Sequence, residues 1–373
     1  MLRYLPRQLL LERNVVQLAF PQRLFGARCV AWVVWLLIEI FPAFAANAAT
    51  LESPWDSTTS SYGNQNVSCP TGVAPVRNIK AFKYYEDDSY TVDPAKRSAY
   101  LDATRNARTA AKQVVELADT YRAAGDTEVA RCASRLLLDQ AKGRALTGKL
   151  TGNQAELFRA WILNSYATAW LKVRHASGLD SNQQRIIVEW LVTLAEGVMR
   201  FHSTFMPKTS EHNLRYWAGL AVINAGIAGG RPDLYEWGVQ WARHGINSIR
   251  PDGTLPQELK RGARALRYHL FALQPLIAIA EIAWINGDDL YSLNDNGLYR
   301  LVNLSLDGLN DPRIVQREAG VKQLKQSVSG TDLEWLVPFA NRFPDAKYNA
   351  FLKKYPIKGT LYLGGKLTST PYQ

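Results

Sequence analysis

Apolar positions recur with the period of an α-helix over most of this chain. From about residue 93 onward they return every three or four positions, and Gly, Pro, Asn or Asp separates one such stretch from the next. The pattern predicts helices over residues 95–118, 126–141, 153–175, 182–205, 211–228, 232–250, 261–286, 295–305 and 331–353. Strand-like alternation is nearly absent, so we expect an all-α protein.

The number and length of these helices also indicate how they pack. Many long helices with short connections and many aromatic residues favour a toroid or solenoid of helices over a simple bundle. Residues 51–76 differ, because they are rich in Ser, Thr, Asn, Gly and Pro and show no helical period. We therefore expect one helical domain over residues 95–373, preceded by an extended arm over residues 46–94.

The N-terminus has the pattern of an export signal. Five arginines precede an apolar run from Cys29 to Ala45 that ends in small residues. The pattern predicts a signal peptide over residues 1–45 and a periplasmic or secreted protein without stable membrane insertion after cleavage. A retained membrane anchor is the alternative, although the run is short for a spanning helix.

Charge and cysteine usage narrow the partners. Removing residues 1–45, with five arginines and two glutamates, lowers the net charge from +11 to +8. A basic exported protein meets anionic polysaccharides or membrane surfaces rather than nucleic acid. Cleavage would also remove one of three cysteines, and the remaining pair in an oxidising compartment predicts a disulfide between Cys69 and Cys132.

Several familiar catalytic motifs are missing from the sequence. It contains no GxSxG, GxxxxGK, HExxH or GxGxxG, and its five histidines do not have metal-ligand spacing. We therefore predict neither a metal site nor a cofactor. A pair of carboxylates for glycoside hydrolysis remains an alternative. The acidic residues available for it are Glu86, Asp87, Asp88, Glu211 and Glu258.

The most informative stretch is Pro256–His269. In a continuous helix Arg261, Arg264 and Tyr268 would share one face, with Arg267 pointing away from it. Guanidinium groups bind carboxylates, and a phenol flanked by cations is pushed towards phenolate and proton transfer. His269 ends the stretch and is a further candidate for substrate binding. The alternative is a basic, solvated helix face.

A second polar stretch precedes the apolar helix that begins near Trp217. Asn213 there either donates to a substrate carboxylate or simply caps the helix. Aromatic rings can also stack on sugars, although most of them must lie in the core. Aromatic residues beside charged or amide groups are the candidates for a binding groove, namely Tyr84, Tyr85, Tyr216 and Trp217.

These stretches resemble the mannuronate-specific alginate lyases, periplasmic or secreted (α/α)-toroid enzymes. The resemblance covers most of residues 69–342, and its most specific block is Pro256–Leu273. The other matching segments are Ser68–Pro70, Phe82–Glu86, Arg131–Ala133, the helix around Trp161, Asn213–Trp217 and Glu334–Pro338.

The resemblance implies roles for individual residues. Arg261 takes the place of the family's carboxylate-binding arginine, Tyr268 that of its catalytic tyrosine, and Asn213 that of its carboxylate-neutralising asparagine. Lys83 matches the family's lysine with a shift of one residue. The chain departs from the family at Leu214, which stands where the family has a histidine, so His212 is the nearest histidine that could serve.

We therefore predict a polysaccharide lyase that cleaves a 1,4-linked polyuronate by syn β-elimination without a cofactor. Polymannuronate is the favoured substrate and polyglucuronate comes next, because both carry the C5 proton and the C4 oxygen on the same side of the ring. Two alternatives remain: a non-catalytic binding or scaffold protein for an acidic polymer, and a hydrolase with two carboxylates.

Overall fold

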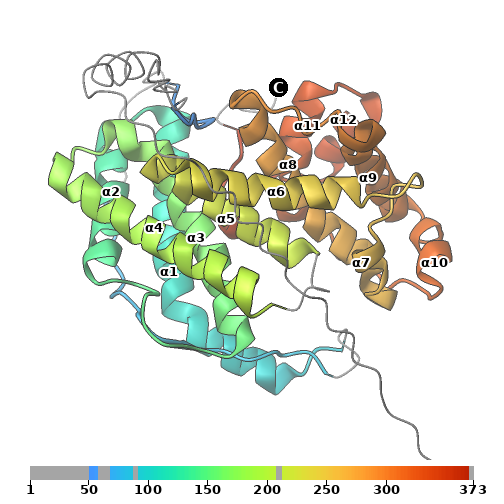
Figure 1. Ribbon diagram of the computed structural model, residues 1–373, viewed down its shortest axis with the longest axis horizontal. Helices are drawn as coiled ribbons and strands as arrows, with labels where there is room; N and C mark the ends of the chain where they lie inside the picture. The colour runs from blue at the N-terminus through green and yellow to red at the C-terminus, as the bar shows by residue number, and fades with distance from the viewer. Residues whose placement is uncertain (1–49, 58–67, 87–90, 207–211, 369–373) are drawn as a thin grey trace, which may run out of the picture. The chain divides into compact units, whose positions relative to one another are not determined.

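The longer helices form an inner and an outer layer, and each consecutive pair contributes one helix to each layer. The computed structural model describes residues 50–57, 68–86, 91–206 and 212–368, so the predicted signal peptide lies outside the described residues. The longer helices are α1 (Pro94–Ala124), α2 (Thr127–Lys142), α3 (Asn153–Val173), α4 (Ser181–Thr204), α5 (Asn213–Gly229), α6 (Pro232–Asn247), α8 (Ala265–Ile285) and α9 (Leu293–Asn310) (Figure 1). The shorter ones are α7 (Pro256–Leu259), α10 (Arg313–Ala319), α11 (Leu336–Arg342) and α12 (Ala346–Lys354).

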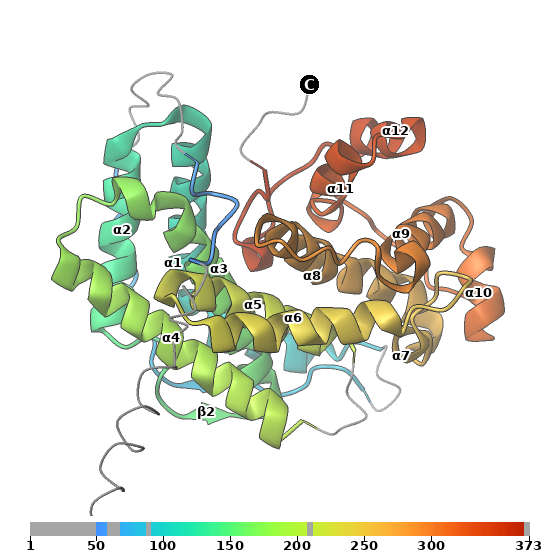
Figure 2. The same cartoon turned by 45° about the horizontal axis from the view of Figure 1, so that its top comes forward.

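Burial separates the inner helices α3, α5 and α8 from the outer helices α4, α6 and α9. Helices α1, α3, α5 and α8 pack on one another in that order, and α2, α4, α6 and α9 each cover the inner helix before them. In α5, 14 of 17 residues are buried. In α6, 7 of 16 are buried, so α6 exposes one face to solvent while α5 lies in the core (Figure 2).

Helices α5 and α6 approach closely because glycine allows it. A Cβ atom on Gly219 would lie 3.0 Å from the carbonyl oxygen of Gly238, and one on Gly238 would lie 2.5 Å from that of Gly219. Any larger side chain at this crossing would push the two helices apart. The pair therefore fixes how the inner and outer layers pack in the middle of the structure.

Helix α8 is apolar along nearly its whole length. A segment ending at Ile285 is long and apolar enough to cross a membrane, but 72% of its most apolar window is buried against other parts of the protein. It contains Pro275 and contacts α5, α6 and α9. These contacts make α8 a core helix, and its apolar composition follows from burial along most of its length.

The N-terminal segment lies along the helices without forming one in its described parts. Its strand β1 (Ile79–Lys80) pairs in parallel with β2 (Leu150–Thr151). Cys69 is bonded to Cys132 of α2, with the two Cα atoms 5.7 Å apart, which confirms the predicted disulfide. The bond and the short ladder hold this segment against the helical layers.

Most predicted helices are present, and two predictions were wrong. The range 261–286 is broken before α8 by a 3₁₀ turn, η2 (Gly262–Arg264), because Gly262 adopts a positive φ of 54°. The range 331–353 contains a 3₁₀ turn and two short helices, α11 and α12, instead of one. Helix α10 was missed, since its 7 residues are too few for a clear period.

Candidate active site

A groove of about 440 Å³ lies where the inner helices begin. Its walls come from the first turns of α1, α3, α5 and α8, from the N-terminal segment and from the C-terminal 3₁₀ turn η4 (Leu361–Leu363). The lining residues are Lys83, Tyr84, Tyr85, Arg97, Tyr100, Leu101, Gln154, Leu157, Trp161, Leu214, Arg261, Arg264, Arg267, Tyr268, Phe271 and Tyr362. Five of these side chains are cationic and seven are aromatic, with no carboxylate among them.

Arg261 and Tyr268 meet in this groove, although not on one continuous helix. Arg261 precedes the 3₁₀ turn and Tyr268 lies in the first turn of α8. The Arg261 guanidinium carbon lies 4.7 Å from the centre of the Tyr268 ring. A carboxylate bound to this guanidinium would therefore lie directly beside the phenol.

The pKa of Tyr268 is shifted in the direction opposite to the prediction. Burial raises it to about 12, and the Tyr85 hydroxyl adds to the shift by accepting a hydrogen bond from the phenol. Arg261 and Arg264 act in the opposite direction but do not compensate for burial. The prediction that cations would push the phenol towards phenolate was therefore wrong, and Tyr268 is a neutral phenol at physiological pH.

The other two arginines of this stretch also line the groove. The Arg264 guanidinium lies over the Tyr85 ring at 5.3 Å, consistent with the predicted binding position. The prediction that Arg267 points away from the groove was wrong, because Arg267 also lines it from the first turn of α8. Arg267 forms an ion pair within the described residues, since its Nη1 donates to Asp332 Oδ1 at 2.6 Å.

The N-terminal segment supplies the opposite wall. Lys83 and Tyr84, both predicted to bind substrate, line the groove. The Lys83 ammonium donates to the Glu86 carbonyl oxygen at 3.2 Å. The Tyr84 and Tyr85 ring centres are 4.8 Å apart, and burial raises the pKa of Tyr84. This wall therefore places phenol groups and one ammonium opposite the arginines.

Asn213 and His212 lie behind the groove wall instead of in it. Asn213 is fully buried, and its backbone amide and side-chain amide donate to the two carboxylate oxygens of Glu258, each at 2.8 Å. The cap of α5 is His212, whose Nδ1 accepts from the Leu214 amide at 3.4 Å. Neither side chain is among the groove-lining residues, and their contact with substrate stays a prediction.

The electrostatics of this cluster follow from burial. Burial raises the pKa of Glu258 to about 7, although hydrogen bonds from Asn213 and the charge of Arg261 oppose the shift. Burial, Arg261 and Arg215 lower the pKa of His212 to about 3. His212 is therefore a neutral cap at physiological pH. Glu258 connects the start of α5 to the loop that carries Arg261.

Three further predicted binding residues are structural. His269 is fully buried, and its Nε2 accepts from the Leu255 amide at 2.9 Å while Nδ1 contacts the Ala265 carbonyl at 2.8 Å. Tyr216 and Trp217 are each about 1% exposed. Their helix, α5, is buried all round, so aromatic residues next to polar ones still face the core. Their prediction as groove residues was wrong.

Several groove residues were missed by sequence reasoning. Leu214, already named as the departure from the family pattern, also lines the groove. Trp161 is only 8% exposed, as a core residue would be, but it also lines the groove. Tyr100, Phe271 and Tyr362 are lining residues that carried no sequence signal, because each lies in an ordinary apolar pattern. Only the fold brings them together.

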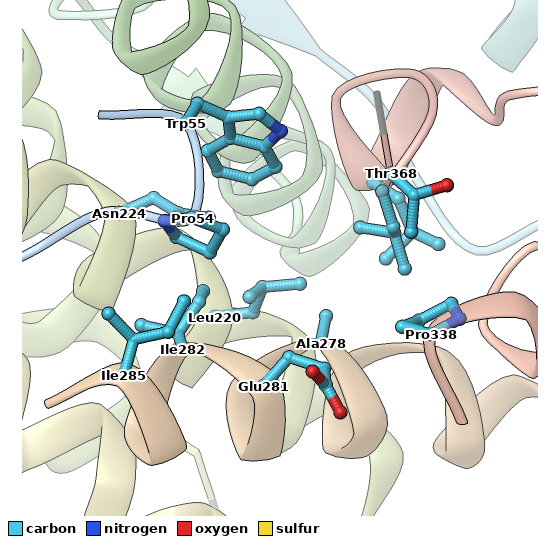
Figure 3. Close-up of a pocket in the computed structure, with 12 residues that line it drawn as sticks. Pro54, Trp55, Leu220, Asn224, Ala278, Glu281, Ile282, Ile285, Pro338 and Thr368 are labelled. Atoms are coloured by element: carbon cyan, nitrogen blue, oxygen red, sulfur yellow. The ribbon is translucent and has the colours of Figure 1, made fainter. Parts of the chain in front are cut away.

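A second cavity, of about 220 Å³, lies at the other end of the same helices (Figure 3). It is lined mainly by apolar side chains of α5, α8, residues 54–55 and the C-terminal segment, including Trp55 and Leu220. Its one ionisable side chain among the described residues is Glu281, whose carboxylate accepts two hydrogen bonds from Arg342 at 2.8 Å. The described lining of this cavity thus includes no cation or phenol for chemistry on an acidic sugar.

Metal ligands do not gather in the part of the chain that the structure describes. There, no group of three or more His, Cys, Asp or Glu side chains could hold a metal ion.

The comparisons with known proteins point to one family. The alginate lyase family model matches residues 78–315, well over half of the chain. This chain belongs to the alginate lyase family. A polysaccharide lyase of Stenotrophomonas maltophilia is 33% identical over 81% of this chain and 90% of its own length. An alginate lyase of Pseudomonas syringae pv. syringae is 32% identical over 82% of this chain and 83% of its own.

Solved structures agree on the fold. Alginate lyase A1-III from Sphingomonas species A1 superimposes with a TM-score of 0.70 at 23% identity, covering 83% of this chain and 88% of its own. A variant of A1-III solved with a bound tetrasaccharide gives a TM-score of 0.68 at 23% identity, with 88% and 89% covered. The fold is an all-α (α/α) toroid, as predicted, and this member of the alginate lyase family is a polysaccharide lyase.

Proposed function

We propose that this enzyme cleaves a 1,4-linked polyuronate by syn β-elimination, with polymannuronate, as in alginate, preferred and polyglucuronate next. The observation that carries the proposal is the position of the Arg261 guanidinium carbon, 4.7 Å from the centre of the Tyr268 ring. Both side chains line a groove whose described lining has cations but no carboxylate. A carboxylated sugar ring at this point would have its acidic group on the guanidinium and its ring protons beside the phenol oxygen.

The chemistry needs three events at one sugar residue. Arg261 binds the C6 carboxylate and neutralises it, which makes the C5 proton more acidic. Tyr268, as phenolate, removes that proton. The electron pair of the C5–H bond forms the C4–C5 double bond while the bond from C4 to the glycosidic oxygen breaks, and the phenol returns its proton to the leaving oxygen. One side chain thus serves as base and then as acid.

The position of Leu214 favours removal of a proton on the same side as the leaving oxygen. An elimination on guluronate, whose C5 configuration is inverted, needs a separate base on the opposite face of the ring. Leu214 cannot exchange protons, and His212 is used as the helix cap with its pKa lowered to about 3. Mannuronate and glucuronate differ only at C2, so both satisfy the geometry.

The similar proteins support alginate as the polymer, since relatives at 31–33% identity are named alginate lyases. We further propose that the protein is exported, with residues 1–45 removed as a signal peptide. The disulfide between Cys69 and Cys132 supports this proposal, because such bonds persist in oxidising compartments.

A substrate panel tests the proposal. Protein beginning at residue 46 is incubated with polymannuronate, polyglucuronate and polyguluronate, and the unsaturated product is followed by its ultraviolet absorbance. We expect the fastest product formation on polymannuronate and the slowest on polyguluronate. Faster cleavage of polyguluronate would contradict the syn mechanism. Saturated products would indicate hydrolysis, and retention on a polymer without any product would indicate a binding protein.

A further inference from the structure

The C-terminal segment passes between the groove and the second cavity. Tyr362 lines the groove, whereas Leu363 and Leu367 line the cavity, as does Thr368 (Figure 3). The segment turns sharply where Gly364 and Gly365 adopt positive φ of 77° and 94°. It is therefore a partition inside the toroid, and one of its side chains faces the proposed substrate.

The backbone of this segment is held by buried polar groups of the inner helices. The Lys172 ammonium, whose side chain is 1% exposed, donates to the carbonyl oxygens of Gly364 at 2.7 Å and Lys366 at 2.8 Å and to Asp119 at 2.6 Å. A buried ammonium is costly unless it is fully paired, and these three acceptors satisfy it. Three further hydrogen bonds hold the segment. Asn164 donates to the Tyr362 carbonyl oxygen at 2.8 Å, and Ser165 donates to the Leu361 carbonyl oxygen at 2.7 Å. The Leu367 amide donates to the Glu334 carboxylate at 2.8 Å.

The Tyr362 side chain is also held in place, by contacts with two other groove residues. Its ring stacks on Trp161 with centres 5.2 Å apart and planes inclined by 25°. Its hydroxyl shares a hydrogen bond with the hydroxyl of Tyr100, another groove residue. Two phenols carry two hydroxyl hydrogens, and one mutual bond uses one of them. The pair therefore has one donor left for an acceptor in the groove.

We propose that Tyr362 binds a sugar residue next to the one that is cleaved, and that Lys172 is the positioning residue that holds it there. The inference rests on the proposed function, because it assumes a polyuronate in the groove. The donor left over by the phenol pair bonds a uronate oxygen, and the exposed part of the Tyr362 ring contacts the pyranose. The rings of Trp161 and Phe271, whose centres are 6.3 Å apart, pack between the rings of Tyr362 and Tyr268. Tyr362 therefore contacts a different sugar from Tyr268.

The test separates binding from turnover. Tyr362→Phe and Tyr362→Ala are compared with wild type in KM and kcat on polymannuronate. Loss of one hydrogen bond should raise KM about threefold to tenfold, and loss of the ring should raise it further, while kcat stays within about twofold. Tyr355→Phe, which removes a phenol outside the groove, is the matched control and should leave KM unchanged. An unchanged KM for Tyr362→Ala, or a fall in kcat alone, would overturn the proposal.

The positioning role has its own readout. Lys172→Met should weaken binding as Tyr362→Ala does, and the double variant should be no weaker than either single one, because both act through one contact. Additive losses would contradict the role of Lys172. Where Lys172→Met fails to fold by circular dichroism, Ser165→Ala, which removes one anchor of the same segment, replaces it with the same expectation.

A binding assay keeps this proposal distinct from the proposed function. The dissociation constant of a mannuronate tetrasaccharide is measured by calorimetry in the Tyr268→Phe background, where it is not consumed. Weaker binding after Tyr362→Phe is added to that background supports the inference even where wild type shows no lyase activity. If wild type is active but Tyr362→Phe leaves the dissociation constant of the tetrasaccharide unchanged, only the inference is overturned. If the protein neither binds nor cleaves any polyuronate, both the inference and the proposed function are overturned.

Discussion

The two ends of helices α5 and α8 enclose two cavities of opposite character. The groove at their N-terminal ends is lined by arginines, a lysine and phenols, whereas the cavity at the other end is apolar and its Glu281 is already paired with Arg342. The same helices supply both walls. Apolar lining therefore does not mark the candidate active site in this fold; a concentration of cations and phenols does, in the larger of the two cavities.

The largest effect should come from the phenol of the groove. Tyr268→Phe keeps the ring and its packing and should fold normally. Because the hydroxyl carries both proton transfers in the proposed mechanism, we expect kcat to fall by at least ~10³-fold. Product absorbance measures the loss, and calorimetry with the tetrasaccharide should show little change in binding. Near-normal turnover in Tyr268→Phe together with loss in His212→Ala would move the base to His212.

A smaller loss should separate two arginines that both line the groove. Arg261→Ala removes the guanidinium beside Tyr268 and should raise the activation barrier by about 2–4 kcal/mol. Arg267→Ala should cost less, because Arg267 is paired with Asp332. The ratio of kcat/KM values measures the difference. Equal losses of kcat/KM from the two substitutions would mean that Arg261 acts only through its positive charge and not through its position beside Tyr268.

The pH dependence should sharpen the assignment of the base. In the proposed mechanism the active form is the phenolate, and the pKa of Tyr268 is raised to about 12. Below that value the phenolate fraction grows about tenfold per pH unit, so kcat/KM should rise with pH through the neutral range. Tyr85→Phe removes the acceptor that favours the protonated phenol and should shift the profile to lower pH. A profile that falls with rising pH would contradict a phenolate base.

Glu258 should make stability depend on pH at the groove end. Its pKa in the folded protein is raised to about 7, above the value of about 4.3 in an unfolded chain. Its contribution is therefore fully present below the unfolded pKa and is lost as pH rises through 7. We expect the free energy of unfolding, relative to Glu258→Gln, to fall by on the order of 3 kcal/mol between pH 4 and 8. Denaturant titrations at several pH values would measure it, and equal slopes for both proteins would contradict it.

The smallest effect on activity should come from the opposite end. Glu281→Gln weakens the pairing with Arg342 and Tyr291, so the melting temperature should fall. The kcat/KM value should stay within about twofold of wild type, because the cavity takes no part in the chemistry. A loss comparable to that of Arg261→Ala would show that the two cavities are coupled.

Sequence patterns predicted the helices well and the groove only in part. Amphipathic periods locate α1 to α6 because most of those helices have a polar face, but the turn at Gly262 depends on one positive φ that periodicity cannot express. Arg261, Arg264 and Tyr268 were found through their dense charge. Tyr216 and Trp217 were misplaced because α5 is buried on all sides, and Tyr362 was missed because it comes from a distant part of the chain.

The common direction of the inner helices gives the groove a charge that no side chain supplies. Arg97 of α1, Gln154 of α3, Leu214 of α5 and Tyr268 of α8 all lie in the first two turns of their helices, so four N-termini converge on one groove. Each helix dipole places about half a positive charge at its start, about two in all. This backbone potential does not titrate and survives arginine substitutions. It should draw a polyanion towards the groove at a rate that falls as ionic strength rises, even in variants that can no longer cleave it.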